Sequence, residues 1–342
     1  MAKLFVIFSI LLSAHSFADV HDDLAELSDL FEHKISGRVS ISPGVRDGER
    51  TLDFAGTDLR LTTTVANKIK FVLTGKIKEL IDAKKLTFNN EYDLATFMRE
   101  AYIEIKNIDG KPVALIMGKR NIFRGQSYRS MPVFRESPLF AHQTLRAVFG
   151  ISVVLSEKML LGIFDKIEAS IYETSEKNNE IDHLGQQIKL SKRISDQLLM
   201  TVAESVELTD DSPSMTLSVG LIGHTKDKSV LGYVEGFIFS NNPEYPNTTM
   251  AVTLGTSLRV ANKTNVIMEL NLVQNYAHQV GLAVTHKPGK EVTLGIEART
   301  TMDQNGDLSH YVGGNVTYKI GNIISVKTKN NSLQFESDFY QE

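Results

Sequence analysis

Apolar and polar side chains alternate residue by residue along most of this chain. The clearest stretch sets an apolar group against a polar one: Val292, Leu294, Ile296 and Ala298 against Thr293, Gly295, Glu297 and Arg299. Because successive side chains of a β-strand point to opposite faces, such a stretch predicts a strand with one apolar and one polar face. Charges on the polar face are incompatible with the core of a β-sandwich. Segments of about ten residues with turns between them instead favour a membrane-spanning β-barrel.

The same alternation, cut at turn residues, divides the chain into eighteen strands. The least regular segments are 113–122, 161–172 and the two nearest the C-terminus, so sixteen strands is the alternative. We therefore expect an all-β fold, a transmembrane antiparallel β-barrel of about 18 strands. The predicted strands cover residues 34–42, 58–66, 68–78, 97–106, 113–122, 145–155, 161–172, 184–194, 197–207, 214–224, 229–240, 249–260, 264–273, 276–287, 291–302, 309–320, 322–328 and 333–340.

The connections between these strands alternate between long and short over the first half of the chain. Residues 43–57, 79–96 and 123–144 are long connections, and the intervening ones at 67 and 107–112 are short. Outer-membrane barrels have short periplasmic turns and longer outside loops. A long first connection therefore places the N-terminus in the periplasm. The pattern fades after residue 260.

The first eighteen residues have the composition of an export signal. Lys3 precedes an apolar run over residues 4–12, and Ser16-Phe17-Ala18 is a small-x-small cleavage sequence. The run is shorter than the roughly 20 apolar residues of a spanning helix. We expect cleavage of a signal peptide, residues 1–18, and export of the chain to the bacterial outer membrane.

Residues 19–33 differ from the rest of the chain, because their apolar positions follow a helical period. Val20, Leu24, Leu27 and Phe31 lie on one face, and Asp and Glu cover the other. The pattern predicts a short acidic amphipathic helix in the periplasm. The barrel is then expected to occupy residues 34–342.

Composition excludes several classes of protein. The chain has no Cys, which argues against disulfide scaffolds, thiolate metal sites and thiol catalysis. Its formal net charge of −4 is unlike that of a nucleic-acid-binding protein. No stretch after the signal approaches the length of a spanning helix, so closed strands are the remaining way to satisfy backbone groups in lipid.

The polar faces of the strands are the expected lining of the barrel lumen. Their basic members predict a pore lining that leans positive and raises the local concentration of anions. The alternative is that these are ordinary solvated wall residues, paired across strands. The candidates in the strands and their ends are Arg38, Arg60, Lys70, Lys76, Arg146, Arg259 and Arg299.

The connection 123–144 is the longest and is rich in arginine. Arg124, Arg129 and Arg135 supply guanidinium groups, which bind carboxylate and phosphate in a forked geometry. This segment is the candidate constriction of the lumen. A solvated loop at the cell surface is the alternative.

Three short passages carry a resemblance to a known family. They are Glu100-Ala101-Tyr102-Ile103-Glu104, Met117-Gly118-Lys119-Arg120 and Phe123-Arg124-Gly125. With the signal and the alternating strands, the chain resembles the outer-membrane porins of Gram-negative bacteria, and these passages resemble phosphate-selective porins. The resemblance implies contact with outer-membrane lipid and passage of small hydrophilic solutes or anions. It is also compatible with a homotrimer. Such porins usually end on an aromatic residue, whereas here Gln341-Glu342 follow Phe339-Tyr340.

Motifs for chemistry are weak. Glu136, Ser137 and His142 could be imagined as a triad, but triads are recognised by geometry, and no G-x-S-x-G sequence is present. Residues 303–307 contain acidic side chains but lack the spacing of a calcium-binding EF-hand, and Asn305-Gly306 is typical of a hairpin turn. We therefore expect no catalytic residues, no metal and no cofactor.

A barrel of 16 to 18 strands encloses a water-filled lumen, whereas about 8 strands would be filled by side chains. The first hypothesis is accordingly a passive diffusion channel for small hydrophilic solutes with modest anion preference, and not an enzyme. The alternative is a binding or adhesion barrel of the cell surface with a closed lumen. An exported soluble all-β protein is the third.

Overall fold

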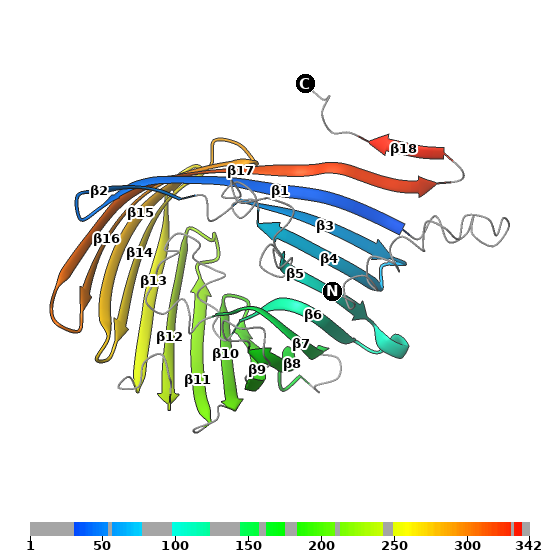
Figure 1. The fold of residues 1–342 in the computed structure, drawn as a ribbon, viewed down its shortest axis with the longest axis horizontal. Coiled ribbons are helices and arrows are strands. Elements are labelled where there is room, and N and C mark those ends of the chain that lie inside the picture. The colour runs from blue at the N-terminus through cyan, green and yellow to red at the C-terminus, as the bar shows by residue number, and fades with distance from the viewer. Residues whose placement is uncertain are drawn as a thin grey trace, which may run out of the picture.

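The structure is a computed structural model of the 342-residue chain. It describes residues 31–53, 57–76, 98–123, 144–156, 162–174, 183–208, 213–241, 249–329 and 332–336. These residues form one antiparallel sheet (Figure 1). No helix in these ranges is long and apolar enough to cross a membrane.

The described residues contain eighteen strands. They are β1 (Phe31–Arg46), β2 (Glu49–Asp53), β3 (Asp58–Val65), β4 (Ile69–Lys76), β5 (Met98–Lys106), β6 (Val113–Phe123), β7 (Thr144–Ser156), β8 (Lys166–Thr174), β9 (His183–Ser195), β10 (Leu198–Leu208), β11 (Ser214–His224), β12 (Val230–Ser240), β13 (Met250–Ala261), β14 (Thr264–Val273), β15 (Ala277–His286), β16 (Val292–Asp303), β17 (Leu308–Lys329) and β18 (Ser332–Glu336).

The sheet closes on itself where the first strand meets the last long one. One edge of β1 pairs with β17, from Glu32↔Lys327 to Arg46↔Tyr311, and the other edge pairs with β3 and then β2. From β3 to β17, each strand pairs with the strand that follows it in sequence. The closed wall therefore has sixteen strands, β1 and β3–β17. Figure 1 shows β1 and β17 side by side along the closure.

The sequence predicted about 18 strands, with 16 as the alternative, and the wall has the alternative number. The predicted strands 309–320 and 322–328 are a single strand, β17, and the last prediction corresponds to the short hairpin strand β18. The sequence pattern missed β2, which extends the β1 hairpin. The predicted strand 161–172 begins too early, because Gly162 adopts a positive φ of 73° in a turn and β8 starts at Lys166.

The predicted N-terminal helix overlaps the start of β1. Its residues 31–33 are strand: Phe31 pairs with Val65, and the next two residues pair on both sides, as Glu32 does with Lys327 and Thr64. Residues 19–30 and the signal peptide lie outside the described residues.

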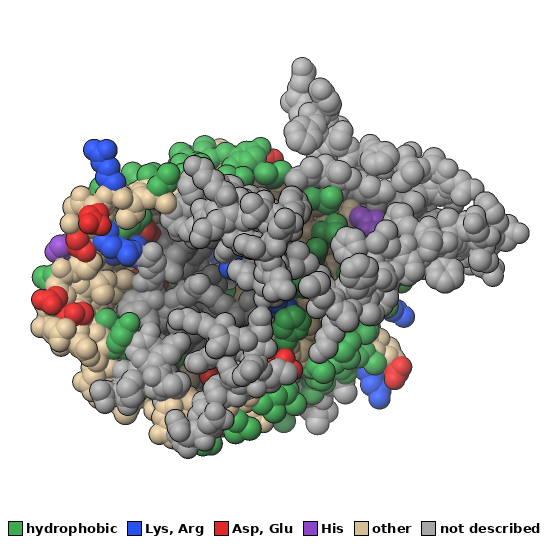
Figure 2. Space-filling model, viewed as in Figure 1, with side chains coloured by type: hydrophobic (Ala, Val, Ile, Leu, Met, Phe, Trp, Pro, Cys, Tyr) green, Lys and Arg blue, Asp and Glu red, His purple; other side chains and the backbone are tan. Residues whose placement is uncertain are grey.

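The convex face of the wall is apolar. The concave face is mostly polar, apart from a buried apolar cluster of Phe237, Phe239, Ala251 and Val273. Ile296 is 69% exposed and Ile238 58% exposed, whereas Glu235 is 1% exposed and Asn271 0% exposed. The concave side can be recognised because side chains there converge across an intervening strand, as Arg120 of β6 does to Glu168 of β8. Figure 2 shows hydrophobic side chains along parts of the outline.

Tyrosines on the concave face lie against glycines of the neighbouring strand. Tyr233 of β12 pairs with Gly255 of β13, and a Cβ added to that glycine would collide with the tyrosine ring. Tyr172 covers Gly185 in the same way. Absence of a side chain at these glycines is therefore what lets the rings lie flat on the wall.

The two ends of the barrel carry different connections. The first residues of β1 and the last of β17 lie at one end, together with short turns such as 66–68, 196–197 and 262–263. The connections 77–97 and 124–143 lie at the opposite end. The predicted alternation of long and short connections therefore holds in the first half of the barrel, and fades in the second, where 274–276 is short at the long-loop end.

The turn between β1 and β2 fastens the closure at the long-loop end. Both Asp47 carboxylate oxygens accept hydrogen bonds from β17: from the Ser309 hydroxyl at 2.6 Å and the His310 amide at 2.7 Å. The Asp47 amide in turn donates to the His310 carbonyl at 3.0 Å. These donors favour the charged carboxylate and lower the pKa of Asp47 from its usual value.

We predict that Ile296→Arg destabilises the folded barrel, while Thr293→Arg on the concave face of the same strand is tolerated. If the convex face meets lipid, as the sequence predicts, an arginine there near mid-membrane costs about 2–4 kcal/mol. Urea unfolding in lipid vesicles measures both. Equal destabilisation of the two variants would show that the faces of β16 are assigned wrongly.

Asp47→Ala is predicted to lower the urea midpoint at neutral pH by removing both acceptors. The Asp47 pKa is lower in the folded state, so its contribution is present above the unfolded-state pKa and lost as pH falls through the folded-state pKa. The difference between wild type and variant should therefore shrink towards zero as the pH falls below the folded-state pKa of Asp47. Asp196→Ala, in a turn at the other end, is the control. A difference independent of pH would contradict the role of the Asp47 charge.

Candidate functional site: the concave face of the barrel

Charged residues of β3, β4 and β5 meet at one level of the concave wall. The register sets Arg60 opposite Thr74, and Thr74 opposite Glu100. Arg60 Nη1 is 3.7 Å from Glu100 Oε2, to which the Thr74 hydroxyl also donates at 3.2 Å. Arg60 Nη2 donates to the Tyr102 hydroxyl at 3.2 Å. The arginine is therefore held against the wall by groups two strands away.

Asp58 and Glu104 each lie between two cations. Asp58 Oδ2 is 2.6 Å from Arg38 Nη2 and 3.6 Å from Arg99 Nη1. The Glu104 carboxylate is 3.8 Å from Lys70 Nζ and 3.5 Å from Lys106 Nζ. One negative charge in each group faces two positive charges.

Glu168 on β8 repeats this arrangement. Its carboxylate is 2.7 Å from Arg120 Nη2 and 2.8 Å from Lys166 Nζ. Arg120 also donates to the Ser152 hydroxyl, which donates to Ser170 at 2.7 Å. We call the concave wall from β1 to β8, with its carboxylates Asp58, Glu100, Glu104 and Glu168, the basic sector.

The wall from β12 to β16 has a different character, and we call it the acidic sector. Glu269 accepts hydrogen bonds from the Tyr233 hydroxyl and from Asn271 Nδ2, the latter at 2.7 Å. Arg299 lies 3.6 Å from Glu297 and stacks on the Tyr311 ring at 4.3 Å. The carboxylates Glu235, Glu269 and Glu297 thus share this side of the barrel with Arg299.

The end of β6 bends over the concave face. Gln187 Nε2 and Lys189 Nζ of β9 both donate to the Phe123 carbonyl oxygen at 3.3 Å. These two side chains share the concave face with Glu168 and Ser170, their register partners. Phe123 is the last residue of β6 and leads directly into residues 124–143. The chain therefore enters that segment from inside the barrel wall.

The structure places some of the predicted lining residues together and leaves others apart. Arg38, Arg60 and Lys70 take part in the ion pairs of the basic sector. Lys76 faces Asp58 in register. Arg259, opposite Asn265, and Arg299 lie on the other side of the barrel, and Arg259 is exposed beside the 262–263 turn.

The remaining predicted residues fall outside what is described. The backbone of Arg146 belongs to β7, but its side chain is outside the described residues. Arg124, Arg129 and Arg135 lie in 124–143, as do Glu136, Ser137 and His142. Within the described ranges, no group of three residues is arranged to hold a metal ion.

Sequence reasoning missed four cations of the basic sector: Arg99, Arg120, Lys106 and Lys166. Irregular pairing explains the first two, because the register shifts between Thr74 and Gly75 beside Arg99, and between Arg120 and Ile122. Such bulges break the two-residue alternation. Lys166, in contrast, shares the face of Glu168 two residues on, and that spacing could have identified it.

The fold is similar to those of solved outer-membrane channels. The channel DcaP of Acinetobacter baumannii matches with a TM-score of 0.63 and 11% identity, covering 85% of this chain and 97% of that one. An anion-selective porin from Comamonas acidovorans matches with a TM-score of 0.57 and 13% identity, over 85% and 100%. Salmonella typhi OmpF, solved with daunomycin, matches with a TM-score of 0.58 and 11% identity, over 85% and 98%.

The TM-scores show a shared barrel fold, and with identities of 11–13% these matches show nothing beyond the fold. No protein-family model matches the chain, and no curated protein matches it in sequence.

We predict that Gly255→Ala destabilises the barrel by about 1–3 kcal/mol, because the new methyl group collides with the Tyr233 ring. Gly236→Ala is the matched control, since nothing lies within 4 Å of its added Cβ. Urea unfolding of the two variants checks the difference. A Gly255→Ala variant as stable as the control would show that Tyr233 does not need the glycine surface.

Proposed function

We propose that this protein is an outer-membrane porin, a passive diffusion channel for small hydrophilic solutes. The observation that carries the proposal is the closed sixteen-stranded wall with an apolar convex face and a charged concave face. Barrels of 16 to 18 strands leave an aqueous channel. The convex face suits lipid, and the concave face suits water and ions. The similarity in fold to solved outer-membrane channels supports this proposal.

We further propose a modest preference for anions. In the basic sector, each of the carboxylates Asp58, Glu104 and Glu168 faces two cations, so the groups leave a surplus of positive charge. Arginine and lysine lining a pore attract anions through their field. The acidic sector opposes this field, which is why the preference is modest.

Residues 124–143, with Arg124, Arg129 and Arg135, are proposed as the constriction. The contacts of Gln187 and Lys189 with the Phe123 carbonyl support this, because they direct the start of the segment into the barrel. The other basic residues predicted from the sequence would line the passage on either side of this constriction. They are Arg38, Arg60, Lys70, Lys76, Arg146, Arg259 and Arg299.

We include the localisation of the protein in the same proposal. Export through a signal peptide cleaved after Ala18 would deliver the chain to the bacterial outer membrane. Assembly as a homotrimer is compatible with the fold. The barrel would perform no chemistry and would lower the barrier for solutes moving down their gradients.

Planar-bilayer conductance with a salt gradient tests the channel and its selectivity. We expect discrete conductance steps and a reversal potential of anionic sign, decreasing in high salt because charges in a wet lumen are screened over about 8–10 Å. A cationic sign would reject the anion preference and leave the channel intact. Folded protein without conductance would instead favour the alternative, a surface binding barrel with a closed lumen.

The constriction is tested in the same apparatus. Replacing Arg124, Arg129 and Arg135 together by Gln should shift the reversal potential towards zero. Replacing Lys78, Lys84 and Lys85 by Gln removes the same charge from the other long connection, 77–97, and should shift it less. Equal shifts of the reversal potential in the two variants would contradict the proposal that residues 124–143 form the constriction.

A further inference from the structure

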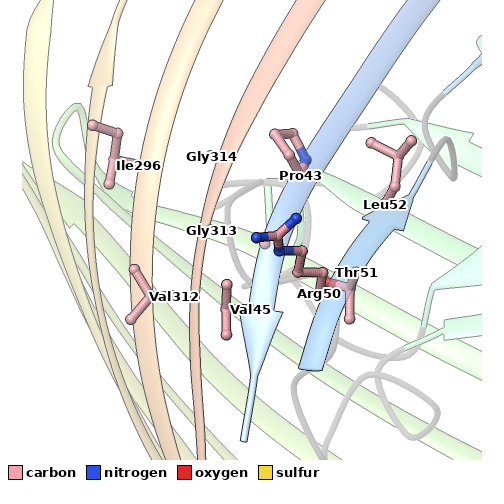
Figure 3. Close-up of a pocket in the computed structure, with 10 residues that line it drawn as sticks. Pro43, Val45, Arg50, Thr51, Leu52, Ile296, Val312, Gly313 and Gly314 are labelled. Carbon is pink, nitrogen blue, oxygen red and sulfur yellow. The ribbon is translucent and has the colours of Figure 1, made fainter. Parts of the chain in front are cut away.

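A groove lies on the convex face, at the closure of the barrel. It has a volume of about 700 Å³ and is formed by β1, β2, β16 and β17 (Figure 3). Pro43, Val45, Leu52, Ile296 and Val312 supply its apolar walls. Pockets for small ligands and cofactors commonly measure about 300–1,000 Å³. The groove is therefore large enough to hold part of a molecule.

Glycine 314 accounts for part of the hollow. It faces outward between the apolar side chains Val312 and Val316, and an added Cβ would meet only atoms at 3.6 Å or more. The wall thus lacks a side chain at a position where one would fit. A larger residue there would fill the groove and leave the strands in register.

Arg50 brings a positive charge to this apolar surface. It pairs in register with Val45, whose side chain is 45% exposed on the convex face. Figure 3 shows its guanidinium extending over β1. Within the described part of the chain, no carboxylate or hydrogen-bond partner accompanies Arg50. A cation on a lipid-facing wall is stabilised by a counter-charge from the lipid itself.

The position of Arg50 fits a lipid head group. It lies two residues after the turn residue Gly48, at the rim with the long connections. The groove runs from this rim along the wall, past Val45 and Val312 to Ile296. A phosphate at the rim and a hydrocarbon chain below it match this order of charge and apolar surface.

We propose that this groove binds an anionic phosphate-bearing membrane lipid, with an acyl chain between β2 and β16 and the phosphate on Arg50. The lipid phosphate would supply a counter-charge to Arg50, and the acyl chain would fill the hollow at Gly314. The site covers the seam between β1 and β17, so a bound lipid would shield the closure of the barrel. The proposal concerns the outer surface and is independent of whether the lumen conducts.

A tryptophan reporter makes the groove measurable, because the chain contains no Trp. Leu52→Trp places a single reporter in the groove, at a side chain that is 61% exposed. Ile238→Trp places a matched reporter on the convex face of β12 near the same rim. The full-length folded protein is reconstituted in mixtures of phosphatidylglycerol and phosphatidylcholine, in which one lipid at a time carries brominated chains that quench tryptophan.

At the groove reporter, we expect phosphatidylglycerol to be favoured over phosphatidylcholine by at least about threefold, and at the Ile238 position we expect no preference. Arg50→Gln should abolish the preference at the groove. Arg46→Gln removes a charge from the same hairpin but on the concave face, where Arg46 lies over the Tyr311 ring, and should leave the preference intact. Gly314→Leu should reduce it by filling the groove.

Three results would overturn the proposal. The first is equal preference at both reporters, and the second is a groove preference unchanged by Arg50→Gln or by Gly314→Leu. The third is a groove reporter that neither brominated lipid quenches while the Ile238 reporter is quenched, because protein would then cover the groove, as in contact with a second copy. Failure of any kind leaves the conductance of the channel untouched and is therefore separate from the proposed function.

Discussion

Pairing of every backbone amide along the closure is the constraint on which this structure depends. A sheet with an apolar outer face has no water to satisfy the edges of its first and last strands. The chain meets this demand by pairing β1 with β17 over almost their whole lengths. The length of β17, from Leu308 to Lys329, follows from this requirement, as does the continuation of β1 down to Phe31. The fold is closed by two strands that are nearly three hundred residues apart.

Closure also determines where side chains can meet. On a flat sheet, groups two strands apart are separated by the intervening strand, but curvature brings their ends together on the concave side. This is why Arg120 reaches Glu168, and why Tyr233 donates to Glu269, each across a strand. The same convergence crowds the inner wall, and Gly185 and Gly255 provide the space that Tyr172 and Tyr233 occupy. Ion pairs and aromatic contacts of the lumen are consequences of the barrel rather than of any single strand.

The sequence predicts the strands well because alternation is a local property of each segment. Val280, Leu282 and Val284 read as outward-facing from their own spacing, and they are exposed in the structure. Errors arise where local pattern and tertiary pairing differ. Gly321 and Asn322 resemble a turn, yet they continue β17, because its pairing with β1 resumes beyond them at Ile324. The partners of each charge depend on register between strands, so the pairing of Asp58 with both Arg38 and Arg99 was beyond sequence analysis.

The arrangement of charges explains how a wall with a charged concave face can be stable. An isolated salt bridge on a hydrated surface contributes little, about 0–1 kcal/mol. The ion pairs of the basic sector therefore add little to the free energy of unfolding. Their main effect is to restrict the side chains, because Glu104 and Glu168 hold the flexible lysines and arginines beside them against the wall. A carboxylate shared by two cations leaves positive charge facing the water while limiting repulsion between neighbours. Charged side chains that would destabilise a packed core are thus compatible with a stable wall here, because only the convex face must exclude water.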